Sequence, residues 1–307
     1  MEDKFIFNNS RLQAVATCST QTIMRYGWHL ASTEEAIARD CGSAVHCCLK
    51  VYFQEWDSEK ALARLIEVYR AGDGLPADDK YHPSNIRLIL KTWMEHFTRD
   101  NLPIEIINPE ENIVMPLNAS NYYFSGKIDA VGVDKRTGAL YVIDHKTTGQ
   151  SVTSEWWLRQ WKLTSQLSGY CWLFGQKSGK LPYGGYINGI QIKRVPLSDR
   201  KCYKHGVKYH ECYREHVLEG CRWEPFERPE FEIERWYRDA LTLGSELLSI
   251  IHYAESGYDI LKRIPQQGKF NGGCTFCDYN EWCRMGRPVH MIENLFKKEP
   301  FIPWEGE

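Results

Sequence analysis

The sequence lacks long apolar runs and has little net charge. No stretch of about 18 or more apolar residues occurs in its 307 residues, and residues 1–4 lack the basic start and apolar centre of a secretory leader. We therefore expect a cytoplasmic chain that does not enter a membrane. The 38 basic and 40 acidic residues give a net charge of −2, which argues against a protein that coats DNA non-specifically and leaves room for a local basic groove. A G-x-x-x-x-G-K-[S/T] phosphate-binding loop is also missing, so no helicase-type ATPase motif is present.

The 11 cysteines are the first feature that stands out among what is present. In a cytoplasmic protein, cysteines are more often metal ligands or free thiols than members of a disulfide framework. With 43% hydrophobic residues, the chain can bury a substantial core.

The order of predicted elements favours a mixed α/β fold. Apolar spacing predicts mainly helical segments at about 10–30, 34–70 and 83–100, then a β region at about 103–117 and a hairpin at about 121–148. It further predicts one long helix at about 154–174, a strand at about 186–195 and another helix at about 229–256. Such an order suits a small central mixed sheet flanked by helices. We expect one domain over residues 1–307, made of a helical N-terminal part (1–105), a catalytic core (106–195), an insertion (196–228), a helix with a cysteine cluster (229–290) and a tail (291–307).

The most informative stretch is the expected hairpin, which contains Gly126-Lys127-Ile128-Asp129 and Ile143-Asp144-His145-Lys146. If its turn lies near 136–138, positions that sum to 273 face each other, and Asp129 then faces Asp144 about 5 Å away. Lys146 lies on the same face as Asp144, because side chains along a strand alternate. Two crowded carboxylates repel unless a hard cation lies between them, so the pattern predicts a Mg²⁺ or Mn²⁺ site that cleaves phosphodiesters. Lys146 would orient or deprotonate the attacking water, or stabilise the developing negative charge.

Three further residues can join this site. Gln166 and Tyr170 are four residues apart on the expected helix 154–174, so they share one helix face and can position a phosphate or a water. His46 lies early in a helix, where a neutral imidazole can complete a metal shell with two carboxylates.

A second constellation lies near the C-terminus. Cys274-x2-Cys277-x5-Cys283 has a spacing that can wrap a metal, and Cys18 supplies a fourth ligand only if the N-terminus folds back across the domain. Spacing alone leaves zinc and an iron–sulfur cluster open. Cys202-x-x-His205 with His210 and Cys212 resembles a zinc pattern, but its spacing is irregular and its segment polar, so we do not expect a second metal site there.

Taken in order, the helical His, Gly-x-x-Asp, Asp-x-Lys and Gln-x-x-x-Tyr motifs resemble the PD-(D/E)XK nuclease superfamily, in its RecB-like branch. The resemblance implies a restriction-endonuclease-like core. It implies metal binding by His46, Asp129, Asp144 and the backbone carbonyl of His145, with Lys146 catalytic and Gln166 and Tyr170 in support. Members often add an upstream acid, for which Glu110 and Glu111 are the candidates.

The iron–sulfur members of that branch, including AddB nuclease domains and the CRISPR-adaptation exonucleases, have one cysteine before the core and three after it, spaced C-x2-C-x5-C. Cys18, Cys274, Cys277 and Cys283 match this pattern, so the resemblance implies a [4Fe–4S] cluster, with zinc as the alternative. We expect the cluster to stabilise the fold.

The expected activity is Mg²⁺- or Mn²⁺-dependent hydrolysis of DNA, and the resemblance suggests an exonuclease acting on single-stranded or frayed ends. It also suggests phage or CRISPR-linked recombination or processing, with protein partners of that kind and, for a phage gene, the cytoplasm of an infected host cell. A non-catalytic DNA-binding adaptor and a site-specific endonuclease are the rival hypotheses. Of the tryptophans at 156, 157 and 161, we expect at least two in the core, and basic residues between 193 and 208 could line a DNA path.

Overall fold

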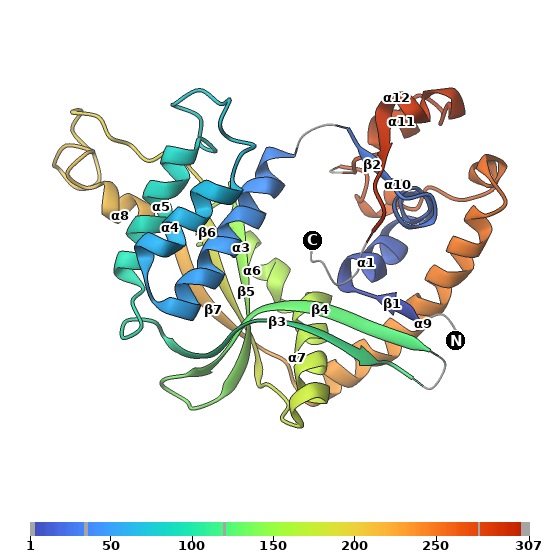
Figure 1. Ribbon diagram of the computed structural model, residues 1–307, viewed down its shortest axis with the longest axis horizontal. Coiled ribbons are helices and arrows are strands. Elements are labelled where there is room, and N and C mark those ends of the chain that lie inside the picture. Colours follow the sequence, from blue (N-terminus) through green and yellow to red (C-terminus); the bar gives the residue numbers. More distant parts are fainter. Residues whose placement is uncertain (1–3, 34–35, 119–120, 276, 302–307) are drawn as a thin grey trace. The chain divides into compact units, whose positions relative to one another are not determined.

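The structure is a computed structural model that describes residues 4–33, 36–118, 121–275 and 277–301 (Figure 1). The chain divides into two compact units. A central unit comprises Ala36–Glu111 and Lys127–Pro229, and a terminal unit comprises Met1–Glu35, Asn112–Gly126 and Glu230–Gly306. The expectation of one nuclease domain over the whole chain remains a prediction.

A mixed β-sheet forms the middle of the central unit, as the sequence predicts. Its strands are β3 (Ile104–Pro116), β4 (Tyr122–Asp134), β5 (Leu140–Thr148), β6 (Gly184–Gln191) and β7 (Cys221–Glu227). The strand order is β4-β5-β6-β7, with β3 paired to β4. The β5–β6 pair is parallel, whereas β4–β5 and β6–β7 are antiparallel.

The β4–β5 hairpin has the predicted register. Ala130 pairs with Ile143 and Val133 with Leu140, so paired positions sum to 273. The turn closes because the Asp134 carboxylate accepts hydrogen bonds from the backbone N–H groups of residues 136 and 137. Gly138 follows with a φ of +70°, a left-handed conformation that glycine adopts without strain.

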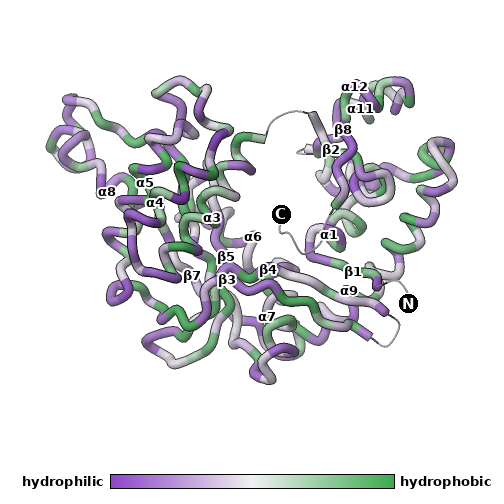
Figure 2. The backbone as a smooth tube through the Cα atoms, in the orientation of Figure 1, coloured by the Kyte–Doolittle hydropathy of each residue, from purple (hydrophilic) through white to green (hydrophobic). Residues whose placement is uncertain are grey.

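Helices cover the sheet of the central unit. The helices α3 (Ile37–Glu55), α4 (Ser58–Val68) and α5 (Pro83–His96) share one apolar cluster with the end of β6, and hydrophobic and hydrophilic residues alternate along them (Figure 2). Helices α6 (Glu155–Lys162) and α7 (Ser165–Ser178) bury a second cluster against β6 and β7. Side-chain caps set the helix starts, since Asp57 accepts from the first turn of α4 and Ser154 from that of α6.

Two sequence predictions about this unit are wrong. The expected single helix at 154–174 is two helices, because Thr164 has an extended backbone (φ −68°, ψ 128°) and begins α7. The expected polar insertion at 196–228 ends in a strand, β7, after a short helix α8 (Tyr213–Leu218). β7 lies at the edge of the sheet, where Pro225 is tolerated although it has no N–H to donate.

The terminal unit gathers segments from both ends of the chain. Its elements are β1 (Phe5–Phe7), α1 (Asn9–Thr17), α2 (Ser19–Thr22), a π-helical turn (Ile23–Gly27), β2 (Leu30–Ser32), α9 (Glu230–Ala254), 3-10 turns (Tyr258–Lys262 and Val289–Met291), α10 (Gly268–Asn271), α11 (Asn280–Arg284), α12 (Ile292–Leu295) and β8 (Phe296–Lys298). β1 pairs in parallel with the start of β4, and β2 pairs with β8.

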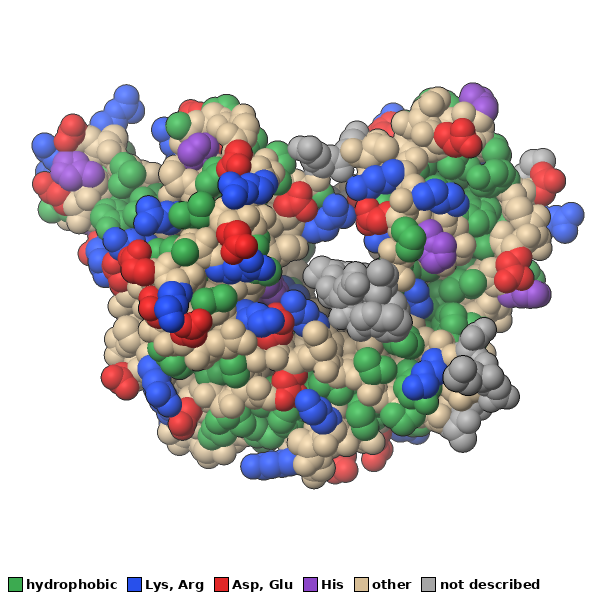
Figure 3. Space-filling model, viewed as in Figure 1, with side chains coloured by type: hydrophobic (Ala, Val, Ile, Leu, Met, Phe, Trp, Pro, Cys, Tyr) green, Lys and Arg blue, Asp and Glu red, His purple; other side chains and the backbone are tan. Residues whose placement is uncertain are grey.

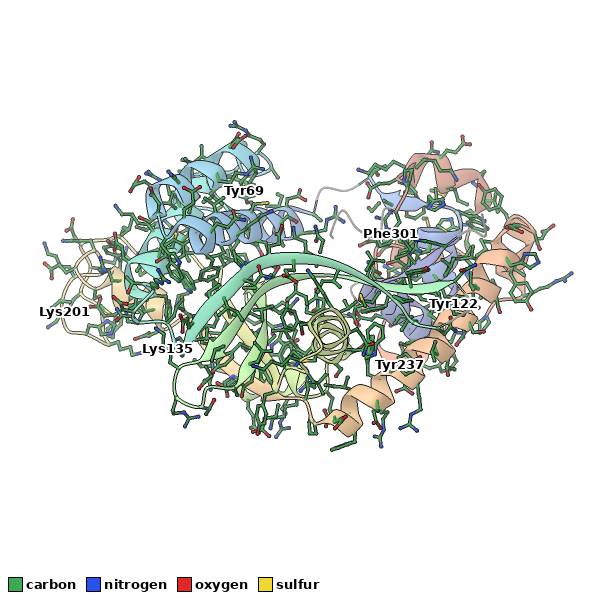
Figure 4. All side chains as sticks on the ribbon, turned by 60° about the horizontal axis from the view of Figure 1, so that its bottom comes forward. Tyr69, Tyr122, Lys135, Lys201, Tyr237 and Phe301 are labelled. Carbon is green, nitrogen blue, oxygen red and sulfur yellow. The ribbon has the colours of Figure 1, made fainter. Side chains whose placement is uncertain are left out.

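The long helix α9 joins these segments. Gly244 lies against Phe7, where an added Cβ would come within 2.6 Å of the ring, so glycine permits close packing on β1. Tyr237, labelled in Figure 4, donates a hydrogen bond to the carbonyl of Leu117 (2.6 Å). No helix in the described ranges combines the length and apolar character needed to cross a membrane.

Candidate active site

The first carboxylate of the site, Asp129, lies where the β4–β5 ladder ends. The last backbone pair of this ladder is Ala130 with Ile143. Beyond this pair, the side chain of Asp129 contacts the backbone of β5. Its Oδ2 accepts from the backbone N–H of His145 (2.7 Å), and its Oδ1 is 2.8 Å from Nδ1 of His46. Burial opposes its charge, but the contacts with the two histidines outweigh this and hold the pKa of Asp129 well below its usual range.

His46 comes from α3, which a glycine brings close to β5. A Cβ at Gly42 would lie 3.1 Å from Oγ1 of Thr147, so α3 approaches the end of β5 one turn before His46. Burial lowers the pKa of His46, but the adjacent Asp129 carboxylate raises this pKa by more than burial lowers it. The net pKa of His46 therefore lies above its ordinary value. The structure therefore brings the predicted helical histidine into direct contact with the predicted aspartate.

The second carboxylate, Asp144, is more deeply buried, with 2% of its surface exposed. Its Oδ2 is 2.9 Å from Nζ of Lys146, which is an ion-pair contact. The geometry of this contact does not meet the criteria for a hydrogen bond. Burial and the nearby Asp129 charge outweigh the attraction of Lys146 and raise the pKa of Asp144 to about 6.

A chain of polar contacts continues from Lys146 to α7. Lys146 Nζ donates to Oε1 of Gln166 (2.9 Å), whose Nε2 donates to the hydroxyl of Tyr170 (3.0 Å). Helix α7 can lie this close because Gly185 has no side chain; a Cβ there would meet Leu167 at 2.5 Å. The three predicted residues thus form one connected row.

Trp161, which the sequence offers as a core or nucleic-acid-contacting residue and not as part of the catalytic site, lies beside the catalytic lysine. Lys146 Nζ lies 5.6 Å from the centre of its ring, a cation–π distance. Trp161 packs against the cluster that buries Trp157, whereas Trp156 is 63% exposed. Of the three tryptophans, only Trp157 is therefore fully in the core, whereas at least two are expected there.

The side chain of His145 is buried and packs in the core. Its ring is 2% exposed, stacks on Phe53 (5.5 Å between centres), and has Nδ1 3.0 Å from Nδ2 of Asn188. Burial lowers its pKa to about 4, so it is neutral at physiological pH. Only its backbone carbonyl was predicted to be a ligand, and this backbone stays in register beside Asn188.

The two upstream acids have different partners. Glu110 is 2.5 Å from Lys50 and 2.8 Å from Lys127. These lysines outweigh the effect of burial and hold the pKa of Glu110 below its ordinary value. Lys50 lies one turn after His46 and Lys127 two residues before Asp129, so Glu110 joins the two elements that carry the site. Glu111 instead pairs with Lys177 of α7 (2.9 Å).

The donor set fits a hard divalent cation. Two buried carboxylates and an imidazole are suitable ligands for Mg²⁺ or Mn²⁺, and Asp144 Oδ2 accepts no hydrogen bond. Within the described ranges, the ligand atoms of His46, Asp129 and Asp144 do not all lie within 4.8 Å of one another. Each carboxylate instead contacts its own cationic neighbour, and an ion shared by both would replace the His46 and Lys146 contacts.

The predicted iron–sulfur cysteines meet in the terminal unit. Cys18, Cys274, Cys277 and Cys283 all line one pocket. The N-terminus does fold back, because the neighbours of Cys18 are bound to the segment before Cys274: Ser19 N–H donates to Gln267 (3.1 Å), and Asn271 donates to the carbonyl of Thr17 (2.9 Å). Cys18 therefore lies near the three C-terminal cysteines, and its role as a fourth ligand remains a prediction.

The four sulfur atoms that line this pocket are spread more widely than the ligands of one zinc ion. Four thiolates around one zinc ion lie about 3.8 Å apart. Within the described residues, no three of these four sulfurs all lie within 4.8 Å of one another.

Comparison with known proteins agrees with this geometry. A family profile of the PD-(D/E)XK nuclease superfamily matches residues 7–284. The chain therefore belongs to the PD-(D/E)XK nuclease superfamily. No curated protein matches the sequence. Among solved structures, the crystal structure of SSO0001 matches with 18% identity and a TM-score of 0.33, over 87% of this chain and 94% of that chain. A TM-score this low supports no conclusion about function.

Proposed function

We propose that the chain is a metal-dependent deoxyribonuclease that acts as an exonuclease on single-stranded or frayed DNA ends. The observation that carries this proposal is the row of contacts from Asp144 through Lys146 and Gln166 to Tyr170, which lies beside the His46–Asp129 pair. Membership of a nuclease superfamily gives the reaction class.

Each residue has a role that its surroundings support. His46, Asp129, Asp144 and the carbonyl of His145 would hold Mg²⁺ or Mn²⁺, which when bound polarises the scissile phosphate and lowers the pKa of water. Lys146 would position the attacking water and stabilise the extra negative charge of the transition state. Gln166 and Tyr170 would fix the Lys146 side chain, because a hydrogen-bonded row restricts its rotamers.

We also propose a [4Fe–4S] cluster on Cys18, Cys274, Cys277 and Cys283, with a structural role. The pocket that all four line supports this assignment. A cluster would connect the N-terminal segment to a segment more than 250 residues later, and cross-links that close long loops restrict the unfolded chain most. Zinc on the same cysteines is the alternative that metal analysis decides.

The decisive experiment is digestion of DNA labelled at its 5′ or 3′ end, single- or double-stranded, with Mg²⁺, Mn²⁺ or EDTA. Wild type should release short products from an end only with a divalent ion. Lys146→Ala should abolish cleavage and leave DNA binding largely intact. Lys135→Ala is the matched control, because Lys135 lies in the turn of the same hairpin and donates to the carbonyls of residues 99 and 100 (Figure 4).

Other results would favour the rival functions. Wild type that binds DNA and never cleaves it would be a non-catalytic adaptor. Discrete fragments from a closed circular duplex would indicate a site-specific endonuclease. Equal cleavage by Lys146→Ala and wild type would remove Lys146 from its role.

A further inference from the structure

The segment between β6 and β7 contains a second cluster of metal-binding side chains, separate from both sites above. From position 197 to position 216 only two residues are buried, Cys202 (1% exposed) and Cys212 (3% exposed). Three of the larger apolar residues of this stretch face solvent, Leu197 (58% exposed), Tyr203 (100%) and Val207 (43%), whereas Tyr213 packs against the apolar cluster of α3–α5. The segment therefore has little apolar core of its own.

The two cysteines meet two histidines. The ligand atoms of Cys202, His205, Cys212 and His216 all lie within 4.8 Å of one another. Cys202 Sγ is 3.5 Å from Nδ1 of His205 and 3.2 Å from Nε2 of His216. In a tetrahedral zinc site with two sulfur and two nitrogen ligands, neighbouring ligand atoms lie about 3.4–3.8 Å apart. The observed spacing is close to that of ligands around one ion.

Local backbone structure brings each pair of ligands together. The first pair lies on a turn in which Cys202 N–H donates to the carbonyl of Val207 (2.7 Å) and Gly206 N–H donates to that of Cys202 (2.9 Å). Gly206 has a φ of +73°, which favours glycine there. The second pair spans the start of α8: Cys212 is its N-cap, and His216, one helical turn later, donates its backbone N–H to the Cys212 carbonyl (3.3 Å).

A carboxylate lies beside one of the histidines. Glu219 Oε1 is 3.5 Å from Nε2 of His205, the nitrogen on the other side of the ring from the cluster, and 2.6 Å from Lys204. Metal-binding histidines commonly have a carboxylate near the ring nitrogen that does not bind the metal.

We propose that Cys202, His205, Cys212 and His216 bind one Zn²⁺ ion. Four protein ligands close the tetrahedral shell, so the site is structural, and it leaves no position for a reacting water. It compensates for the small apolar core of residues 197–216 and fixes the loop that carries Arg200, Lys201, Lys204 and Lys208.

This proposal revises the expectation that no second metal site exists. The sequence pattern includes His210, but in the structure His210 contacts Asp199 (3.3 Å) and is not part of the cluster. His216 takes its place and makes the set regular: C-x2-H-x6-C-x3-H. Figure 3 shows basic, acidic and histidine side chains together on this projecting end of the central unit, where Figure 4 labels Lys201.

The test is zinc content per full-length chain after dialysis, by mass spectrometry of the metal. Wild type and His210→Ala, the matched control from the same segment, should each retain one zinc. His216→Ala and Cys202→Ser should lose it while their iron content stays unchanged, which separates this site from the four-cysteine pocket. Zinc that is equal in His216→Ala and wild type, or absent from wild type grown with zinc, would overturn the proposal. So would a Cys202–Cys212 disulfide in the purified chain.

Two further measurements avoid variants that fail to fold. Wild type loaded with Co²⁺ in place of zinc should show the visible bands of a tetrahedral ion with thiolate ligands; octahedral bands would contradict the assignment. Trypsin should cut between residues 200 and 208 much faster after chelation, and readded zinc should restore protection. Equal cutting with and without zinc would exclude a structural role.

Discussion

Replacing Asp144 by asparagine should stabilise the metal-free protein while it destroys activity. Asp144 is 2% exposed, and its pKa rises from 3.8 to about 6 in the folded state. Each pKa unit corresponds to about 1.4 kcal/mol, so holding the ionised form in the fold costs about 3 kcal/mol at pH 8. Asparagine resembles the neutral acid in shape and removes this cost.

The pH dependence fixes the sign of the effect. Between about pH 4 and pH 6 the folded state binds the Asp144 proton and the unfolded state has lost it, so wild-type stability falls as pH rises through that window. The advantage of Asp144→Asn should therefore be about 3 kcal/mol at pH 8 and below about 1 kcal/mol at pH 4.

Urea unfolding in EDTA, followed by tryptophan fluorescence, measures this difference. Asp134→Asn is the matched control, a second buried aspartate on β4. Hydrogen bonds from Tyr186 and the 136–137 turn outweigh burial and lower the pKa of Asp134, so this variant should lose stability. Saturating Mg²⁺ should narrow the gap, because only wild type gains binding energy. An Asp144→Asn variant that is no more stable than wild type at pH 8 would refute the reasoning.

Three other predictions concern metal binding and packing. Mg²⁺ affinity, measured by calorimetry, should fall as the pH is lowered, first as His46, whose pKa is raised, takes up a proton, and more steeply below about pH 6, where a proton on Asp144 also competes with the metal; an affinity unchanged down to pH 4.5 would contradict this. Cys277→Ser should lose iron and the brown colour of the anaerobically purified chain, whereas Cys171→Ser, in α7, should keep both; zinc without iron in wild type would show that the cluster assignment is wrong. Gly189→Ala should lower the free energy of unfolding by about 1–3 kcal/mol, because its Cβ would lie 2.4 Å from the ring of Trp157. Gly74→Ala, with open space around its Cβ, is the control. Equal urea midpoints for the two variants would contradict the packing argument.

Local patterns carried most of the correct fold predictions. The hairpin register followed from one turn and the two-residue period of strands, and it brought the carboxylates of Asp129 and Asp144 to the same end of the ladder. The helix break at Thr164 could not be predicted, because no proline or glycine marks it in the sequence. The sequence does not predict β7, because Pro225 and its polar neighbours are unfavourable in most strands. They are tolerated here because β7 lies at the edge of the sheet.

The unpredicted site residues depend on long-range packing. Lys146, Gln166 and Tyr170 could be read from short motifs. The approach of Trp161 to Lys146 depends on how α6 lies on the sheet, which no local pattern specifies. His216 carried a usable signal, because it is four residues after Cys212, one helical turn away.

The most direct test of the central claim is digestion of end-labelled single-stranded DNA by wild type and Lys146→Ala, with Mg²⁺ or Mn²⁺ and with EDTA. The account predicts metal-dependent release of nucleotides by wild type, none by Lys146→Ala, and none by either in EDTA. Cleavage that persists in EDTA or in the lysine variant would contradict it.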